Sequence, residues 1–146
     1  MQAVQPPRPT GIPEDAEIAS TGGFNKYVGP LYRLSDLEEG AVKRFAFAAA
    51  EQHMNGSGSV HGGMLMTFMD TSMSRTSRLI SEAKGTATVS LTCDFVAPAK
   101  LGDVIESRVR VTRRTRTIVF LSCELVCGER VLMVGSGVWK ISGAEE

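Results

Sequence analysis

Several groups that could do chemistry lie close together in the segment NGSGSVHGGMLMTFMD, residues 55–70. If a helix begins at Gly62 and Gly63, its first N–H groups have no partner within the helix, and the helix dipole adds partial positive charge there. Two glycines would leave that end open to a ligand oxygen, as in an oxyanion hole or an anion site. The glycines could equally serve only a tight turn or close packing, and the pattern leaves both explanations open.

His61 and Asp70 are the two titratable side chains of this segment. His61 could be a helix cap, a general base or a packed polar side chain. No second histidine or carboxylate stands at ligand spacing, so we expect no metal site. Asp70 follows Phe68 and Met69, and a carboxylate in such surroundings is costly to bury without a partner. It therefore faces solvent or pairs with a basic group such as Arg75, or it acts as a general base or nucleophile.

The spacing between the two side chains limits how they could work together. Nine residues of helix are about two and a half turns, so His61 and Asp70 would lie on opposite sides of the helix and about 13 Å apart along it. Asp70 would then be unable to reach the start of its own helix. If both act at one site, that site joins two chains, and a symmetric dimer would contain two such sites.

Hydrophobic periodicity predicts the elements that must position these residues. We predict a helix at about 61–83, ended by Lys84-Gly85, and a strand before it at 43–54. Residues 21–40 carry turn signals and are expected to form loops with one short helix. Four later segments alternate apolar and polar residues and predict a meander of strands, at 86–100, 103–114, 117–127 and 130–142.

The faces of these elements predict an α+β fold with a curved antiparallel sheet around one helix. The helix is apolar nearly all round near its start, as expected when a sheet encloses it. In the strand at 86–100, Leu91, Cys93 and Phe95 share the apolar face, and Thr88 lies on the opposite, polar face. Large apolar residues are also expected on the outer face of the sheet, which favours association with another copy: Ile118, Phe120, Val131 and Trp139.

Composition limits the function classes. The chain has 146 residues and is 42% hydrophobic, enough for one domain with a core, expected at 21–142 between a flexible, Pro-rich N-terminal tail (1–20) and a short C-terminal tail (143–146). Sixteen basic residues balance sixteen acidic ones, so we expect no nucleic-acid or membrane partner. There is no signal peptide or membrane-spanning run, and the three cysteines have no disulfide pattern, which together predict a cytoplasmic protein.

Asn55, His61-Gly62-Gly63 and Asp70, with these spacings, resemble the motif of the hotdog-fold acyl-CoA thioesterases of the PaaI type. The later segment VSLTCDFVAPAKLGD resembles the strand that follows the central helix in that family, and the resemblance extends over residues 22–141. It implies a hotdog fold, in which a curved antiparallel sheet of about five to six strands wraps one long central helix.

The resemblance also implies catalytic roles. Asp70 would be the catalytic carboxylate, as general base or as nucleophile, and the Gly62 N–H would polarise the thioester carbonyl. His61 would hold that turn and contact the thioester or the leaving sulfur. Asn55 would orient the carbonyl or the lytic water across a subunit boundary, and Thr88 would assist that water.

Substrate contacts are implied for four more residues, Gly63 and Arg113, Arg114 and Arg116. The three arginines lie in a hairpin that is near bound CoA in related proteins and would suit the phosphates of the nucleotide. The alternative is an ordinary solvated turn.

The sequence therefore predicts a hydrolase, an acyl-CoA thioesterase that needs no metal or cofactor and works as a homodimer or homotetramer. A non-catalytic acyl-CoA-binding or sensor module on the same fold is the alternative, although it would have no need of Asp70. A dehydratase of this fold would need differently spaced motifs. The sequence does not distinguish which acyl group the substrate carries.

Overall fold

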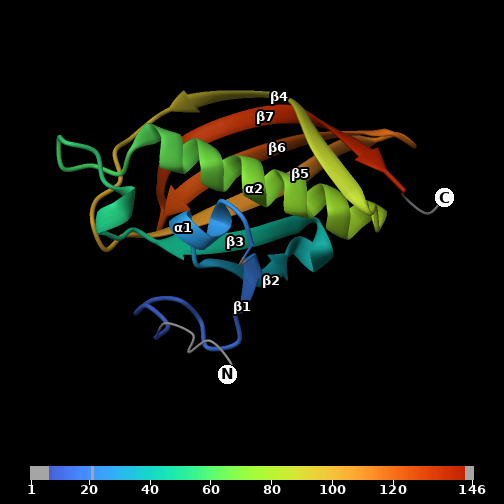
Figure 1. Cartoon of the computed structure of the whole chain (residues 1–146). Helices are drawn as coiled ribbons and strands as arrows, with labels where there is room; N and C mark the ends of the chain where they lie inside the picture. Colours follow the sequence, from blue (N-terminus) through green and yellow to red (C-terminus); the bar gives the residue numbers. More distant parts are fainter. Residues whose placement is uncertain (1–6, 21, 144–146) are drawn as a thin grey trace.

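The computed structural model describes residues 7–20 and 22–143, and residues 1–6, 21 and 144–146 lie outside the described part (Figure 1). Two short 3-10 turns, at Glu38–Gly40 and Glu51–His53, accompany the regular elements. In chain order these elements are β1 (Glu17–Ser20), α1 (Asn25–Val28), β2 (Leu31–Leu37), β3 (Val42–Ala48), α2 (Gly62–Ser81), β4 (Gly85–Phe95), β5 (Val104–Arg114), β6 (Ile118–Cys127) and β7 (Arg130–Ser142).

The seven strands form one antiparallel sheet in the order β1-β2-β3-β5-β6-β7-β4. The sheet curves around α2, which lies across its concave face (Figure 1). This arrangement confirms the predicted hotdog fold, with seven strands in place of five to six. The helix keeps nearly its predicted bounds.

Strand β4 is not where a simple meander would place it. It follows α2 in the chain but pairs with β7 at the far edge of the sheet, and β5 pairs instead with β3. The predicted four-strand meander is therefore wrong in its order, although the strands exist. Strand β4 is therefore an edge strand, eleven residues long.

The core lies between the sheet and α2. Phe47 of β3 and Phe68 of α2 meet edge-on with their ring centroids 4.7 Å apart. Trp139, predicted on the outer face, is instead fully buried against the helix, and its indole N–H donates to Ser74 Oγ at 2.8 Å. An indole that can reach a hydroxyl in this way is stable in a core. Of the apolar residues predicted on the outer face, Phe120 is exposed and Ile118 and Val131 are partly exposed.

The N-terminal segment differs from its prediction as a flexible tail. Strand β1 pairs with β2, and Ile12 and Ala16 are buried against the outer face of the sheet beside Tyr32. The Arg8 guanidinium donates to the Ala16 carbonyl at 2.8 Å and lies over the Tyr32 ring. The folded domain therefore includes residues well before position 21. Of the tails predicted at 1–20 and 143–146, residues 1–6 and 144–146 lie outside the described part of the chain.

Candidate active site

The loop that leads into α2 is organised by Asn55. Its side-chain oxygen accepts the N–H groups of Ser57 and Ser59, at 2.9 and 3.0 Å, and its own N–H donates to the Ser59 carbonyl at 2.7 Å. These bonds use the acceptor of the carboxamide and fix its orientation. The NH2 group of Asn55 has no partner among the described residues, so the side chain presents a hydrogen-bond donor.

His61 is the N-cap of α2. Its Nδ1 accepts the N–H of Gly63 at 2.8 Å, and its backbone N–H donates to the His53 carbonyl at 2.8 Å. An imidazole that accepts at Nδ1 carries its proton on Nε2 when neutral, so the exposed nitrogen is a donor. Of the three roles considered for His61, the structure shows the helix cap.

The two glycines after His61 are not equivalent. The Gly63 N–H is already bound by His61, and a Cβ at Gly63 would lie 2.9 Å from His61 Nδ1. The Gly62 N–H, by contrast, has no hydrogen bond to any residue in the described ranges. It is therefore the N–H at this helix end that a ligand oxygen could take. The predicted substrate contact of Gly63 has its backbone donor already engaged.

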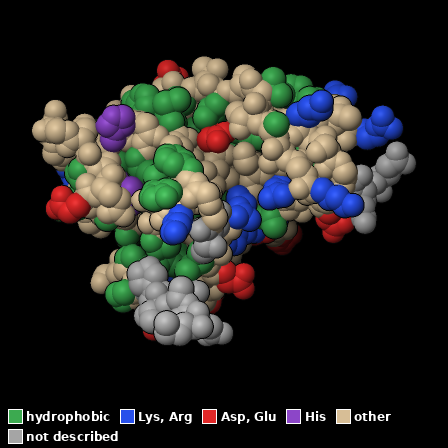
Figure 2. Space-filling model, in the orientation of Figure 1, with side chains coloured by type: hydrophobic (Ala, Val, Ile, Leu, Met, Phe, Trp, Pro, Cys, Tyr) green, Lys and Arg blue, Asp and Glu red, His purple; other side chains and the backbone are tan. Residues whose placement is uncertain are grey.

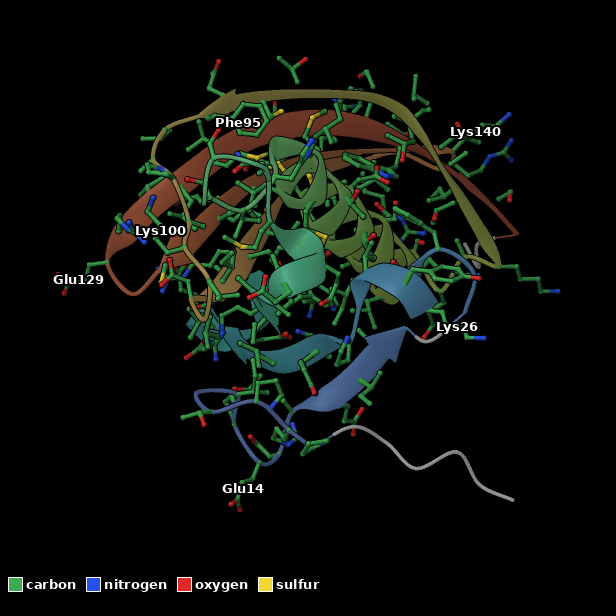
Figure 3. The ribbon with its side chains drawn as sticks, turned by 60° about the vertical axis from the view of Figure 1, so that its left-hand side comes forward. Glu14, Lys26, Phe95, Lys100, Glu129 and Lys140 are labelled. Atoms are coloured by element: carbon green, nitrogen blue, oxygen red, sulfur yellow. The ribbon has the colours of Figure 1, made fainter. Side chains whose placement is uncertain are left out.

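Phe95, at the end of β4, is a neighbour of this helix end that no motif singled out. Its ring lies against Gly62, where an added Cβ would be 3.1 Å from Phe95 Cε1 (Figure 3). The side chain is nevertheless 54% exposed. An apolar ring thus stands beside the open N–H, and the sequence placed it only on the apolar face of its strand.

Asp70 lies in the middle of α2 and is half-buried. Thr88 of β4 donates its hydroxyl to Asp70 Oδ1 at 2.6 Å. Within the described part of the chain Asp70 has no ion pair, so the alternative pairing with Arg75 is not observed. A carboxylate held by one hydroxyl and open on its other side keeps acceptor capacity for a water or a substrate.

Thr88 reaches Asp70 because β4 contains a bulge. Thr88 pairs with Trp139 and Leu91 pairs with Gly137, and the register shifts between Thr88 and Ser90. One extra residue moves every side chain beyond it to the other face of the strand. Thr88 therefore shares the helix-facing side with Leu91, whereas simple alternation predicted opposite faces.

The three arginines of the hairpin lie at the other end of α2. They are exposed, and Arg114 donates to the Ile80 carbonyl at 3.1 Å, near the last residue of the helix. A helix of 20 residues is about 30 Å long. Within one chain Arg113, Arg114 and Arg116 are thus far from Gly62.

An open hollow of about 210 Å³ lies beside Asp70 on the exposed side of α2. Asn25 of α1, Thr86 of β4 and the helix residues Arg75 and Arg78 also line it. None of these four is among the site residues predicted from the sequence. The described residues hold no cluster of three or more side chains suited to a metal ion, and no helix among them is long and apolar enough to cross a bilayer.

Known proteins similar to this chain are thioesterases and esterases. Residues 57–134, just over half of the chain, match the family model of the Thioesterase superfamily. Two proteins named as esterases are similar in sequence: F42H10.6 of Caenorhabditis elegans is 37% identical over 74% of this chain and 63% of its own length. PA0474 of Pseudomonas aeruginosa is 31% identical over 78% of this chain and 84% of its own.

Human acyl-coenzyme A thioesterase 13 is 32% identical over 51% of this chain and 54% of its own length. The chain thus spans less than two thirds of the worm and human relatives. Escherichia coli PaaI superposes with a TM-score of 0.71 at 20% identity, over 82% of this chain and 84% of that one. A hypothetical thioesterase of Streptococcus pneumoniae solved with coenzyme A gives 0.66 at 17%, over 80% and 88%. At these identities the two structures show the fold.

Proposed function

Because this chain belongs to the thioesterase superfamily, we propose that it hydrolyses the thioester of an acyl-CoA to a free acid and CoA. The observation that carries the proposal is the pairing of Thr88 with Asp70 at 2.6 Å, on a helix whose first N–H, at Gly62, has no partner among the described residues. A thioesterase needs a carboxylate for the attack and a donor for the carbonyl oxygen. The thioesterase 13 relative and the coenzyme A complex support the choice of acyl-CoA as substrate.

The developing charge on the thioester oxygen is the first thing that the site must stabilise. The Gly62 N–H donates to that oxygen, aided by the positive end of the helix dipole. The Asn55 NH2 group, fixed by the two bonds to its oxygen, supplies a second donor for the carbonyl or for the attacking water. His61 holds the turn that exposes Gly62 and offers its Nε2–H toward the leaving sulfur.

Asp70 supplies the negative charge for the attack. As a general base it takes one proton from water, whose oxygen then bonds to the carbonyl carbon while the C–S bond breaks, and that proton passes to the leaving sulfur to give CoA. As a nucleophile it bonds to that carbon itself while the C–S bond breaks and the CoA thiolate leaves, and water then cleaves the resulting anhydride into the free acid and the Asp70 carboxylate. Both routes give the same acid and CoA. Thr88 orients the carboxylate in either route through the bond to Oδ1.

Helix geometry separates Asp70 from Gly62 of its own chain by eight residues, about 12 Å along the axis. We therefore place one catalytic site across a dimer, with Asp70 of one protomer facing Gly62 and Asn55 of the other. The edge strand β4 supports such a dimer, since Val89 within it and Val96 directly after it are 62% and 57% exposed. Long apolar edges favour pairing with a second copy. The predicted role of Arg113, Arg114 and Arg116 in binding CoA would likewise draw on a neighbouring chain.

Hydrolysis of a panel of CoA thioesters, followed by thiol release, tests the proposal. The wild-type protein should turn over at least one acyl-CoA, and Asp70→Asn should lose at least a hundredfold in kcat. The asparagine still accepts the Thr88 hydrogen bond, so fold and oligomer should persist, which circular dichroism and light scattering would verify. Undiminished turnover by Asp70→Asn would overturn the mechanism. Binding of acyl-CoA without turnover by the wild type would favour the non-catalytic module.

A further inference from the structure

A second cavity lies beside the Asp70 hollow, between the C-terminal half of α2 and strands β1, β2 and β3. Its volume is about 380 Å³, within the range of small-molecule sites. Ile18, Phe45 and Leu79 give it apolar walls, and Arg75 and Arg78 line it from the helix. We call this cavity the arginine groove. Figure 2 shows Lys and Arg side chains gathered from the centre of this face to its right-hand side.

The two helix arginines have fewer partners among the described residues than Arg33, the third arginine of the groove. Within those residues the Arg78 guanidinium makes one hydrogen bond, to the Lys84 carbonyl at 2.6 Å. Arg33 is fully engaged, since it pairs with Asp36 and donates to the Leu34 and Arg44 carbonyls. Arg75 makes no hydrogen bond or ion pair with any described residue, although it is half-buried. The charged side chain that acts on the pKa of Arg75 is another cation, Arg78.

The positive charge of Arg75 has no ion-pair partner among the described residues. Burial lowers the pKa of the Arg75 guanidinium, and the charge of Arg78 lowers that pKa further. Two cations three residues apart on a helix repel each other, and desolvation adds to the cost. Glu17 also lines the groove, but it forms no ion pair within the described ranges. An anion bound between Arg75 and Arg78 would offset both the repulsion between the two cations and the cost of their desolvation.

We propose that the arginine groove binds an organic carboxylate with an apolar body. The carboxylate lies between Arg75 and Arg78, whose guanidinium groups can each offer two parallel N–H donors. The hydrocarbon body lies on Ile18, Phe45 and Leu79, which a fully hydrated inorganic anion would leave unused. None of these five residues belongs to the proposed catalytic set.

Such a carboxylate can come from two sources. Arg75 and Arg78 also line the Asp70 hollow, and Arg75 lies five residues, about 7.5 Å along the axis, from Asp70. The carboxylate can therefore be the far end of an acyl group whose thioester is at Asp70, and this source rests on the proposed hydrolysis. Alternatively it belongs to a free acid that binds by itself, which does not depend on catalysis.

A titration with hexanoate, followed through the NMR signals of the arginine Nε–H groups, tests the groove directly. Hexanoate should shift the Arg75 and Arg78 signals in the wild type, and hexan-1-ol, which has the body without the charge, should not. Arg75→Met removes the guanidinium but keeps an apolar stem, and it should weaken hexanoate binding at least tenfold. Lys140→Met removes one exposed positive charge outside the groove and should leave the affinity within twofold (Figure 3). Equal binding by wild type and Arg75→Met would overturn the proposal.

Kinetics then identify the source. Adipoyl-CoA and hexanoyl-CoA have acyl chains of equal length, and only the first ends in a carboxylate. If the substrate supplies the carboxylate, the kcat/KM for adipoyl-CoA divided by that for hexanoyl-CoA falls at least tenfold in Arg75→Met. If a free acid is the ligand, the ratio stays constant while hexanoate binding is lost. Failure to hydrolyse any CoA thioester would refute the proposed function, and the titration would still decide the groove. Weaker self-association of Arg75→Met without carboxylate binding would show that a second copy covers the groove, against the proposal.

Discussion

The two ends of α2 differ in how their backbone groups are satisfied. At the first residue, the Gly62 N–H has no partner in the described part of the chain, and His61 binds the next N–H through its own ring. Glycine and the exposed Phe95 ring leave this end open at the surface.

The last turn of the same helix is closed by the protein itself. Glu82 adopts a left-handed conformation (φ 53°), and its N–H donates to the Arg78 carbonyl at 2.8 Å. The Ser81 hydroxyl is buried, and Arg114 donates to the Ile80 carbonyl. Side chains and a C-cap therefore satisfy groups that a helix end otherwise leaves to water.

The local sequence therefore determines whether the backbone groups at a helix end are bound by the protein itself or left unbound. One terminus of α2 supports stability and the other is free for a ligand. Substitutions at the open end should therefore change activity with little effect on stability, and substitutions at the closed end should do the reverse.

Gly62→Pro should have the largest effect on the open end. Proline removes the N–H that we assign to the thioester oxygen, yet the first position of a helix accepts proline well. His61 already has ψ 133°, which suits a residue before proline. We expect kcat to fall about 100- to 1,000-fold, as for loss of an oxyanion donor.

Gly62→Ala is the matched control, because alanine keeps the N–H and brings the same crowding against Phe95. Steady-state kinetics and thermal melting of both variants separate the two effects. Similar kcat values for the proline and alanine variants would refute the role of the Gly62 N–H.

Thr88→Val should have an intermediate effect, halfway along the helix. Valine has nearly the shape of threonine but lacks the hydroxyl that holds Asp70 Oδ1. One hydrogen bond to a charged group contributes about 1.5 kcal/mol, so we expect kcat to fall about tenfold. Thr88→Ser should retain most activity because it keeps the donor. If valine and serine variants have equal kcat, the bond has no part in catalysis.

Arg114→Met should have the smallest effect and should act at the closed end. The variant loses the bond to the Ile80 carbonyl, and exposed charged contacts are worth about 0–1 kcal/mol, so Tm should fall by no more than about 4 °C. We expect kcat to stay at the wild-type value. A rise in KM for acyl-CoA would support the predicted CoA contact, whereas a large loss of kcat would contradict the division between the two ends.

Much of the fold followed from periodicity and end signals in the sequence. The later strands alternate apolar and polar residues, the helix is apolar nearly all round near its start, and Lys84-Gly85 marks the end of α2. Strand β2 was missed because both of its faces are covered: Leu31 packs in the main core and Tyr32 packs under the N-terminal segment. Arg33 adds a charged residue that lines the arginine groove. A strand with this pattern shows no clean alternation.

The candidate site was predictable in its residue types and less so in its contacts. Asn55, His61, Gly62 and Asp70 lie in one continuous motif. The contact of Thr88 depends on a one-residue bulge, which alternation cannot reveal. Gly137 offered a partial signal, since an added Cβ there would collide with the Ser90 carbonyl beside the bulge.

The central claim, one active site built by two chains, is tested most directly by complementation. Asp70→Asn and Asn55→Ala chains, each with its own affinity tag, are co-expressed and the heterodimer is isolated. If the site is shared, one of its two sites joins an intact Asp70 to an intact Asn55, and thioesterase activity should return to about half that of the wild type. If each site lies within one chain, both sites carry a defect, and activity no higher than that of the two mutant homodimers would contradict the account.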